Sequence, residues 1–364
     1  MAELFVALAD SDFREYSPVY DRLARAIARD DSLIEFVARH ARTDARRGRV
    51  PVLFLAAIHD VVLADPGSPL AAIYRGESAA DPWPEFRALV DREADVIAAH
   101  LATRSVQTNE VGRSAVLAPA LSGVARTGDP PVALVEIGPS AGLNLFPDRY
   151  AIEYVRDGAV LARAGDDASP VRLSTEVVGP CSIPVPVELP TIAVRTGIDP
   201  APVDVTDPRQ RRWLQACVWP GVPDRPALLA AALDLVAQDP PALVRGDAVT
   251  DLGPVLAGLP GSGEVLPVVV ATWALAYVSS AGRAELLAAV DAIGATRDLA
   301  LVTFEEPRAT PWVPALADGS ASAAGGTSTV LGVREWRAGR CRTRALAHAQ
   351  PHGRRIAWAD DRES

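Results

Sequence analysis

The chain has 364 residues, of which 49% are hydrophobic and 23% are charged, so its composition is that of a folded globular protein rather than a disordered one. Its formal net charge of −10 excludes nucleic acid and anionic membranes as expected partners, because both select basic surfaces. All 36 basic residues are arginines, which excludes a Schiff-base lysine, a phosphate-loop lysine and a kinase strand lysine.

The sequence also lacks the patterns of a metal site, a disulfide framework or a membrane span. Its three cysteines, Cys181, Cys217 and Cys341, are widely spaced and odd in number. Its five histidines include no H-E-x-x-H motif and no close pair on a helix, so we expect no transition metal. The N-terminus has no signal-peptide pattern and no apolar run reaches the roughly 18–20 residues that span a bilayer, so we expect a cytoplasmic protein.

Residues 1–125 have the pattern of a helical region. SPVYDRLARAIARD (17–30) begins with Ser17 as a predicted N-cap and Pro18 at the first helical position, and apolar residues then recur at helical spacing. The same spacing recurs in four later stretches, at residues 31–41, 50–64, 84–102 and 112–125. RTDARRGR (42–49) is interpreted as a solvated loop, with a basic patch as the alternative. We therefore predict a helical N-terminal lid domain over residues 1–128.

His59 lies within the apolar helix that is predicted over residues 50–64. A histidine in such a helix is more often a hydrogen-bonded core residue than a functional one. If its ring faces a cleft, however, His59 is the best candidate for a general base.

Residues 129–364 have the alternating pattern of an α/β domain. VALVEI (132–137) is a continuous apolar run, as expected of a buried parallel strand, and a glycine-containing turn and a helix start follow it. The later predicted elements are strands at 149–155, 268–278 and 299–307, a helix at 279–294, a hairpin at 334–349 that turns at Ala338-Gly339, and a strand at 355–359. Residues 156–240 are interpreted as an insertion with one core strand (191–198), and residues 319–326 as a mobile loop. The predicted fold class is a Rossmann-like, mostly parallel sheet with antiparallel C-terminal strands.

The turn GPSAG (138–142) after the first strand is compatible with more than one chemistry. As G-x-S-x-G it matches a nucleophile elbow with Ser140 as the nucleophile, and His348 or His352 comes late enough in the chain to be its base. The match is poor, because helices rather than strands precede the turn and His348 falls inside a predicted strand. A serine hydrolase is therefore the third alternative.

Two cofactor-binding loops are also compared with this turn. A dinucleotide loop is disfavoured, because the second and third glycines of G-x-G-x-x-G would be Ser140 and Leu143. The loop of a class I S-adenosylmethionine-dependent methyltransferase fits better, with the acid Glu136 two positions before Gly138 and a further glycine at Gly142. Ser140 replaces the middle glycine of that loop.

In this interpretation the turn holds the amino-acid end of the cofactor. Backbone N–H groups of the turn and of the following helix start, with Ser140 and Ala141 in the turn, receive the cofactor carboxylate. Glu136 positions the loop or the cofactor ammonium. Gly138 permits the sharp reversal of the chain and Gly142 permits a close approach.

Polar residues on both sides of the turn are added to the predicted site. QTNEVGRS (107–114) contains Asn109, a candidate helix cap, together with Glu110 and Arg113. Arg113 is placed to pair with the cofactor carboxylate, and a structural salt bridge is the alternative. Asn144 caps the helix, contacts the ligand or simply packs.

Acidic residues farther along the chain are assigned to the nucleoside. Glu153, in the second predicted strand, is preferred to Asp157 for the ribose hydroxyls. Asp247, followed by Ala248 in RGDAV (245–249), is assigned to the adenine. The alternatives are an exposed strand residue for Glu153 and a turn residue for Asp247.

Residues at the ends of the later strands are candidates for the acceptor site. Trp273 and Tyr277 end the strand at 268–278, at the carboxyl edge where ligands bind in open α/β sheets, although Trp273 is alternatively a core residue. Glu305 and Glu306 end the next strand, where acid/base residues are found, although both are alternatively solvated. The candidate walls of the acceptor pocket are Trp213, Trp219 and Trp273.

Six segments together resemble a bacterial protein family of unknown function: QTNEVGRSAVLAPAL, VEIGPSAGLNLFPDRY, RTGIDPAPVDVTDP, RRWLQACVWP, RGDAV and TWALAYV. They are spread over nearly the whole chain and are far more specific than the glycine turn alone. The resemblance implies a methyltransferase-like fold with a helical N-terminal region. It implies no substrate.

The sequence therefore predicts transfer of a methyl group from S-adenosylmethionine to a small molecule, without a metal. The first alternative is a binding or regulatory protein that has kept the fold and lost the transfer. The serine at position 140 and the lack of a clear catalytic base favour that alternative. The oligomeric state is left open.

Overall fold

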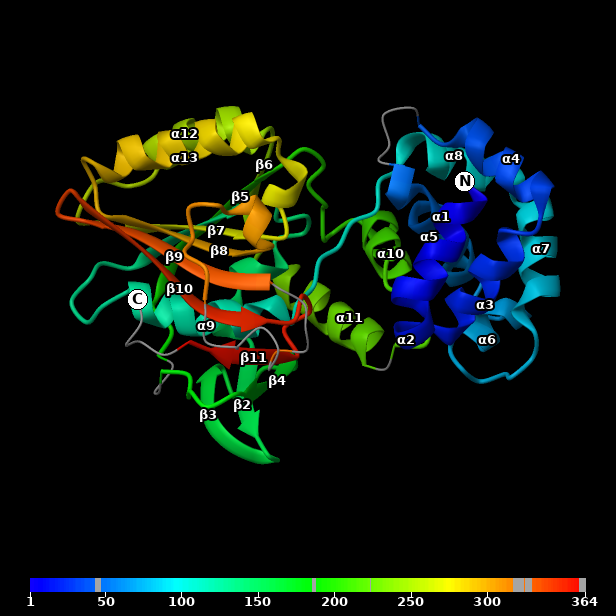
Figure 1. Cartoon of the computed structure of the whole chain (residues 1–364), viewed down its shortest axis with the longest axis horizontal. Coiled ribbons are helices and arrows are strands. Elements are labelled where there is room, and N and C mark those ends of the chain that lie inside the picture. Colours follow the sequence, from blue (N-terminus) through cyan, green and yellow to red (C-terminus); the bar gives the residue numbers. More distant parts are fainter. Residues whose placement is uncertain (43–46, 185–187, 223, 317–323, 325–328, 360–364) are drawn as a thin grey trace. The chain divides into compact units, whose positions relative to one another are not determined.

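The computed structural model describes residues 1–42, 47–184, 188–222, 224–316, 324 and 329–359. Two predicted loops lie partly outside these stretches, namely the middle of the basic segment (43–46) and nearly all of the segment 319–326. Figure 1 shows the chain with most of its helices and strands labelled.

The contacts within the chain define two units, and each unit combines two separate segments. The helical unit contains Met1–Thr108 and Asp204–Ala230, and the sheet unit contains Asn109–Val203 and Ala231–Ser364. The division differs from the predicted boundary at residue 128, because the chain enters the sheet unit at residue 109. Part of the predicted insertion belongs to the helical unit.

The helical unit is built from short helices that begin at local signals. They are α1 (Ala2–Leu8), α2 (Arg14–Tyr16), α3 (Pro18–Ile27), α4 (Asp31–His40), α5 (Val50–Ala64), α6 (Pro69–Tyr74), α7 (Pro82–Arg92), α8 (Ala94–Thr103) and α10 (Pro208–Ala216). Ser17 accepts the backbone N–H of Tyr20 and Pro18 is the first residue of α3, so the predicted helix start is confirmed. The stretch 84–102 forms two helices, because Glu93 leaves helical geometry between α7 and α8. No helix in the described stretches is both long and apolar enough to cross a membrane.

The core of the helical unit surrounds α5. This helix is apolar on nearly all sides, and most of its residues are buried. Phe5, Leu23 and Phe86 pack in the same core. Trp213 and Ala216 of α10 join it, so the second chain segment completes the core that the first segment begins.

The sheet unit contains one mixed sheet. Its strands are β1 (Val132–Ile137), β2 (Ala151–Arg156), β3 (Ala159–Gly165), β4 (Arg172–Val178), β5 (Ile192–Asp199), β6 (Ala242–Arg245), β7 (Leu266–Thr272), β8 (Leu299–Glu305), β9 (Thr329–Arg337), β10 (Arg340–Ala349) and β11 (Arg355–Trp358). Their order across the sheet is β3-β2-β4-β11-β10-β9-β8-β7-β1-β5-β6. The predicted mixed α/β class, with a mostly parallel sheet and antiparallel C-terminal strands, is confirmed.

The parallel part of the sheet is centred on β1, which pairs with β5 on one side and β7 on the other. Strands β1, β7 and β8 are buried along their whole length, as expected of continuous apolar runs in a parallel sheet. The hairpin of β9 and β10 turns at Ala338 and Gly339, as predicted, and both residues have the positive φ that a tight hairpin turn requires.

Helices cover both faces of this sheet. Helices α12 (Ala248–Ala257) and α13 (Ser280–Gly294) pack on one face, and α9 (Arg113–Val124) packs on the other (Figure 1). The α9 helix contacts β8, β9 and β4, and the hydroxyl of Tyr154 in β2 donates to the carbonyl of Ala115, with a donor–acceptor distance of 2.7 Å. On this face α9 therefore contacts strands from β8 to β2. The helix α11 (Arg225–Val236) contains the residue at which the two units divide.

Two expectations about the chain after β1 are wrong. The strand predicted at 149–155 exists as β2, but it pairs with β3 and β4 near one end of the sheet, whereas β5 lies beside β1. No α-helix follows the turn, where the chain instead forms two three-residue 3₁₀ helices, Leu143–Leu145 and Pro147–Arg149. Pro147 has no N–H to donate to the carbonyl of Leu143, and β2 begins soon afterwards, so a longer helix cannot form.

Candidate functional site

The candidate site lies where the parallel strands end at their carboxyl edge. Ile137 of β1 is in register with Ala271 of β7 and Ile198 of β5, and Thr272 of β7 is in register with Phe304 of β8. The residues that follow β1, β5 and β7, and the last residue of β8, therefore meet at one edge of the sheet.

Glycines allow the loops after β1 and β7 to touch. Gly138 has a φ of +67°, and a Cβ atom on it would lie 2.9 Å from the Cβ atom of Ala274. Gly142 has a φ of +74°, and a Cβ atom on it would lie 2.7 Å from Cγ of Pro241. Both positions therefore need glycine for backbone conformation and for close approach, as predicted. Their roles toward a ligand stay predictions.

Ser140 is held in the left-handed region by a carboxylate that the sequence analysis missed. Its φ is +54°, and its backbone N–H donates to Oδ2 of Asp199 at 2.8 Å. Oδ1 of Asp199 accepts the N–H of Ala201, also at 2.8 Å. Asp199 is the last residue of β5, so an acid at the end of TIAVRTGI was the signal that could have identified it. Ala141, which follows Ser140 in the turn, is fully buried.

The Ser140 hydroxyl is buried and makes no hydrogen bond to any described residue. His348 lies in β10, in register with Val330 of β9 and Ala357 of β11. His352 has its Nδ1 atom 3.1 Å from Oε2 of Glu110. Neither imidazole is bonded to Ser140, so the geometry lacks the serine–histidine pair of a hydrolase.

Glu136 is a buried acid in the middle of the apolar strand β1. Because Val135 and Ile137 belong to the core beneath α12 and α13, the alternation of a strand directs Glu136 to the face that α9 covers. Burial raises the pKa of Glu136 to about 8, although the charge of Arg113 and the side chain of Asn144 lower it. Its Oε2 atom has no hydrogen-bond partner among the described residues.

Arg113, the first residue of α9, ties three segments together at this edge. Its Nη1 donates to the carbonyl of Thr272 at 3.0 Å and its Nε donates to the carbonyl of Pro351 at 3.1 Å. Its positive charge lowers the pKa of both Glu136 and Glu305, so it lies close to both acids. These contacts give Arg113 a structural role, and its pairing with a cofactor carboxylate stays a prediction.

Glu305 organises the turn after β7. Its Oε1 accepts the backbone N–H groups of Ala274 and Leu275, at 2.7 Å and 2.8 Å. The side chain is fully buried, and burial raises its pKa to about 7 despite these two donors. Its Oε2 has no hydrogen-bond partner among the described residues. The next residue, Glu306, pairs instead with the exposed Arg308.

Trp273, immediately before that pair of donors, has a φ of +55°. Its backbone N–H donates to the carbonyl of Phe304 at 3.1 Å, and its indole Nε1 is buried without a partner among the described residues. Tyr277 ends the short 3₁₀ helix that follows, and its side chain is exposed.

Two asparagines hold the loop after β1 from the side of α9. Asn109 Nδ2 donates to the carbonyl of Pro139 at 3.1 Å, while its Oδ1 has no partner among the described residues. Asn144 Oδ1 accepts the hydroxyl of Ser114 in α9 at 2.9 Å. Packing, one of the alternatives for Asn144, is therefore one of its roles.

Five buried polar atoms at this edge thus have no hydrogen-bond partner in the described protein: Asn109 Oδ1, Glu136 Oε2, Ser140 Oγ, Trp273 Nε1 and Glu305 Oε2. An unsatisfied buried polar group costs roughly 1–3 kcal/mol, so such groups are rare, and their grouping makes this edge of the sheet the candidate site. Asn109 Oδ1 is an acceptor, Trp273 Nε1 is a donor, the Ser140 hydroxyl is both, and each carboxyl oxygen accepts when its group is ionised. Among the described residues no group of three or more metal-ligating side chains is present.

Glu153 was predicted at the ribose, and the topology contradicts that placement. Six strands stand between β2 and β1 in the sheet. Glu153 Oε1 instead accepts Nε of Arg163 in β3 at 2.9 Å, on an exposed surface. Asp157, the second choice, has a φ of +51° in the turn between β2 and β3, also far from β1 in the strand order.

Asp247 follows β6 at the same edge as the candidate site. Its Oδ1 accepts the N–H of Val249 at 2.9 Å, which makes it the N-cap of α12. Its side chain is exposed, and the neighbouring Ala248 is buried in α12. Asp247 is therefore a turn and cap residue, and its contact with adenine stays a prediction.

The predicted site residues of the helical unit are packed in its core. His59 is buried, its Nδ1 lies 3.1 Å from the carbonyl oxygen of Ala216, and burial lowers its pKa to about 4. Trp213 is buried and donates its Nε1 to the carbonyl of Ser105 at 3.0 Å. Trp219 packs edge-on against Phe13. His59 is therefore a buried, hydrogen-bonded residue, as its core interpretation expects, and Trp213 belongs to the same core. Trp219 is half-buried and packs against that core, so its role as a pocket wall stays a prediction.

Comparison with known proteins identifies the family of the chain. No match to the chain was found among the curated proteins. A family model matches residues 2–358, which is nearly the whole chain. The chain therefore belongs to the family of uncharacterized proteins conserved in bacteria that is designated DUF2332.

Proposed function

We propose that the sheet unit binds S-adenosylmethionine and transfers its methyl group to a small-molecule acceptor. The observation that carries the proposal is Glu136, a buried acid with an unpartnered oxygen near the carboxyl end of the central strand. Acids also follow the next two strands along the sheet, Asp199 at the end of β5 and Asp247 just after β6. A ligand with an ammonium, a ribose and an amino-purine presents the donors that three such acids accept.

The strand order supports the same proposal. If the parallel strands β1, β5, β6, β7 and β8 are numbered in chain order, their spatial order is 3-2-1-4-5. This is the order of Rossmann-like sheets, which bind nucleotide-like ligands outside the carboxyl ends of the strands, where the order reverses. Here that point lies between β1 and β7, beside Gly138 and Ala274.

The proposal assigns the parts of such a cofactor to the residues at this edge with two changes from the predicted roles. The ammonium would contact Glu136 Oε2, and a cation there stabilises the charged carboxylate. Asp199 takes the ribose role that was assigned to Glu153, because each of its oxygens has a second lone pair beyond the loop N–H it already accepts. The cofactor carboxylate would contact the Ser140 hydroxyl, since no α-helix N-terminus follows the turn.

The proposed reaction is a displacement in which an acceptor lone pair forms a bond to the methyl carbon while the carbon–sulfur bond breaks and sulfur keeps its electron pair. The protein aligns the two reactants and excludes water. Trp273 forms part of the wall. Where the acceptor carries a proton, Glu305 is the base, because its Oε2 is unpartnered and its pKa of about 7 suits proton transfer near neutral pH.

Titration calorimetry tests the binding step. We expect the protein to bind both S-adenosylmethionine and S-adenosylhomocysteine. Glu136→Gln should weaken binding by about tenfold or more, because the amide oxygen still accepts a hydrogen bond but has no negative charge to attract the ammonium. Glu153→Gln is the matched control, since it makes the same chemical change far from β1, and we expect it to bind as the wild type does. Absence of binding by the wild type, or equal binding by the two variants, contradicts the proposal.

A second measurement separates transfer from binding. Protein that binds the cofactor is incubated with labelled S-adenosylmethionine and pools of small-molecule acceptors. Label in an acceptor, reduced by Glu305→Gln, supports the methyltransferase. Binding with no transfer to any pool supports the binding or regulatory alternative, and fluorophosphonate labelling of Ser140 without cofactor binding supports the hydrolase.

A further inference from the structure

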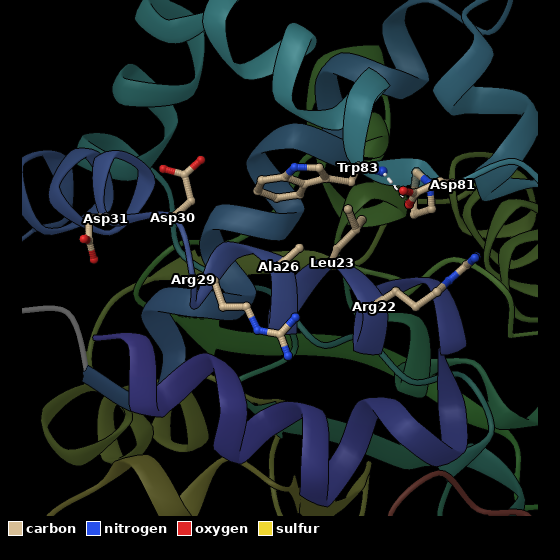
Figure 2. Close-up of a pocket in the computed structure, with 9 residues that line it drawn as sticks. Arg22, Leu23, Ala26, Arg29, Asp30, Asp31, Asp81 and Trp83 are labelled. Atoms are coloured by element: carbon tan, nitrogen blue, oxygen red, sulfur yellow. Dashed lines mark hydrogen bonds between the residues drawn. The ribbon is translucent and has the colours of Figure 1, made fainter.

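The helical unit has a pocket of its own, with a volume of about 580 Å³. Figure 2 shows the residues around it, which come from α3, from the starts of α4 and α7, and from the residues that join α3 to α4. Sites for small organic molecules have volumes of roughly 300–1,000 Å³, so the pocket is large enough for one. Neither the proposed methyl transfer nor the family assignment gives it a role.

One wall of the pocket is a fixed aromatic surface. Trp83, the second residue of α7, stacks on the fully buried Phe86 with a centroid distance of 5.9 Å and an interplanar angle of 17°. Its backbone N–H donates to Oδ1 of Asp81 at 3.2 Å, which fixes the start of α7. Figure 2 shows Leu23 and Ala26 of α3 next to the indole. A planar apolar group can therefore pack here without reorganising the wall.

The carboxylates around the pocket interact with the N-termini of helices α4 and α7. Asp30 Oδ1 accepts the N–H of Leu33 at 3.1 Å as the N-cap of α4, and Oδ2 lies 3.3 Å from Nε of Arg87. Asp81 caps α7. Asp31 is in the first turn of α4, where the helix dipole favours a negative charge.

The two arginines around the pocket, by contrast, form no ion pairs within the part of the chain that the structure describes. Arg22 and Arg29 have no ion-pair partner among the residues that the structure describes, whereas Arg25 between them pairs with both Asp10 and Asp21. Figure 2 shows the indole of Trp83 and the guanidinium of Arg29 on opposite sides of Ala26, with the side chain of Arg22 pointing in a different direction from that of Arg29. A molecule that packs on the indole therefore reaches Arg29 only by lying across Ala26. Guanidinium groups bind carboxylates and phosphates with two parallel hydrogen bonds and also stack on planar rings.

We propose that this pocket binds a small planar aromatic molecule that carries a carboxylate or a phosphate. The ring packs against Trp83, above Leu23 and Ala26. The anionic group extends across Ala26 and pairs with Arg29, while Arg22 adds positive charge at another side of the pocket. The proposal is independent of the function of the sheet unit, because every residue that carries it belongs to the helical unit.

Fluorine NMR tests the proposal on the full-length protein. The chain has seven tryptophans, so 5-fluorotryptophan labelling gives seven signals, and Trp83→Phe identifies the signal of Trp83. The probes are phenyl phosphate, benzoate, benzyl alcohol and benzylamine. We expect phenyl phosphate or benzoate to shift the Trp83 signal in a saturable way, and neutral benzyl alcohol to bind about tenfold more weakly or worse.

Charge reversal supplies the decisive comparison. We expect Arg29→Glu to weaken binding of the anionic probes by about tenfold or more, with Arg22→Glu acting in the same direction. Arg39→Glu, which makes the same change at an exposed site on α4 outside the pocket, is the control and should bind as the wild type does. Arg29→Ala gives the same comparison if the reversed charge disturbs folding. Benzylamine binding as tightly as phenyl phosphate, or no saturable shift with any probe, overturns the proposal.

Discussion

Glu136 and Glu305 are buried acids whose carboxyl groups have only part of their possible hydrogen bonds. Each has one oxygen without a described partner, and burial raises the pKa of each despite the nearby charge of Arg113. The cost of burial therefore exceeds the attraction to Arg113 at both positions. Acids of this kind concentrate at functional sites, because a ligand that supplies a cation or a donor regains the missing interaction.

The raised pKa of Glu136 makes the stability of the protein depend on pH. Between its ordinary value of 4.5 and its folded value of about 8, the folded state binds more protons than the unfolded state, so stability falls as pH rises. His59, whose pKa is lowered to about 4, acts in the opposite sense below about pH 6.5. Glu305, whose pKa is raised to about 7, acts in the same sense as Glu136 up to about pH 7. The effect of Glu136 alone is therefore clearest from about pH 7 to 8.

We expect the melting temperature of the wild type to fall by up to roughly 2–3 °C per pH unit in this window because of Glu136, since one proton corresponds to about 1.4 kcal/mol per pH unit and unfolding entropy is about 2.1 cal/mol/K per residue. Glu136→Gln should show a shallower slope, because glutamine does not titrate. Melting curves at several pH values measure the difference, and Glu153→Gln serves as the control with the wild-type slope. Parallel slopes for the wild type and Glu136→Gln would show that Glu136 does not titrate in this range.

At the scale of elements, the loops after β1 and β7 share one arrangement, in which a buried carboxylate holds a strained backbone. Each contains a non-glycine residue with positive φ, Ser140 or Trp273, which costs on the order of 1–3 kcal/mol. In each loop a buried carboxylate, Asp199 or Glu305, accepts backbone N–H groups from that residue or the ones after it. The two loops then meet at Gly138. Strained backbone held in this way is typical of functional sites.

The surroundings of Gly138 and Gly123 predict opposite effects of substitution by alanine on stability. Gly138→Ala should destabilise the protein by about 1–3 kcal/mol, because the new methyl group meets Ala274 and the φ is positive. Gly123→Ala, in the helix α9 and with nothing within 4 Å, should stabilise it by about 0.5–1 kcal/mol through helix propensity. Urea unfolding of both variants measures the two effects. A Gly138→Ala variant as stable as the wild type would mean that the loops can separate at little cost.

At the scale of the whole molecule, the helical unit is assembled from two distant parts of the chain. Arg212 of α10 donates Nε and Nη2 to the two oxygens of the buried Asp60 of α5, at 3.0 Å and 3.2 Å. His100 of α8 lies 3.1 Å from the same carboxylate. One buried acid thus joins three helices from two chain segments, and residues 204–230 are part of this fold rather than a detachable insertion.

We expect Asp60→Asn to loosen α10 selectively. The amide leaves Arg212 without its ion pair, at a cost of about 1–3 kcal/mol, since Arg212 is 37% exposed and retains some solvent. Hydrogen exchange in α10 should become faster while exchange in β1, in the other unit, stays unchanged. Asp21→Asn, which breaks an ion pair on α3, is the control and should leave α10 protected. Unchanged exchange in α10 would show that apolar packing alone holds it.

Much of the candidate site follows from local sequence features. Glu136 and Gly138 lie at the end of the apolar run that forms β1. Trp273 and Glu305 lie at the ends of the apolar runs that form β7 and β8. Because these strands are parallel, the sequence predicts that the four residues meet at the carboxyl edge of the sheet. Asp199 could not be identified as a site residue from the strand pattern. The strand that follows β1 in the chain is β2, and the sequence does not reveal that β2 pairs elsewhere.

The sequence by itself determined the helices of the N-terminal region, the buried strands β1, β7 and β8, and the hairpin turn at Ala338-Gly339. These features depend on the spacing of apolar residues and on the conformational preferences of a few residues, which act over short distances along the chain. Only the tertiary structure decided which strand lies beside β1, which segments share a core, and which acids face one another. Backbone hydrogen bonds between strands are the same for every sequence, so the neighbours of a strand are selected by the packing of the whole sheet and its helices.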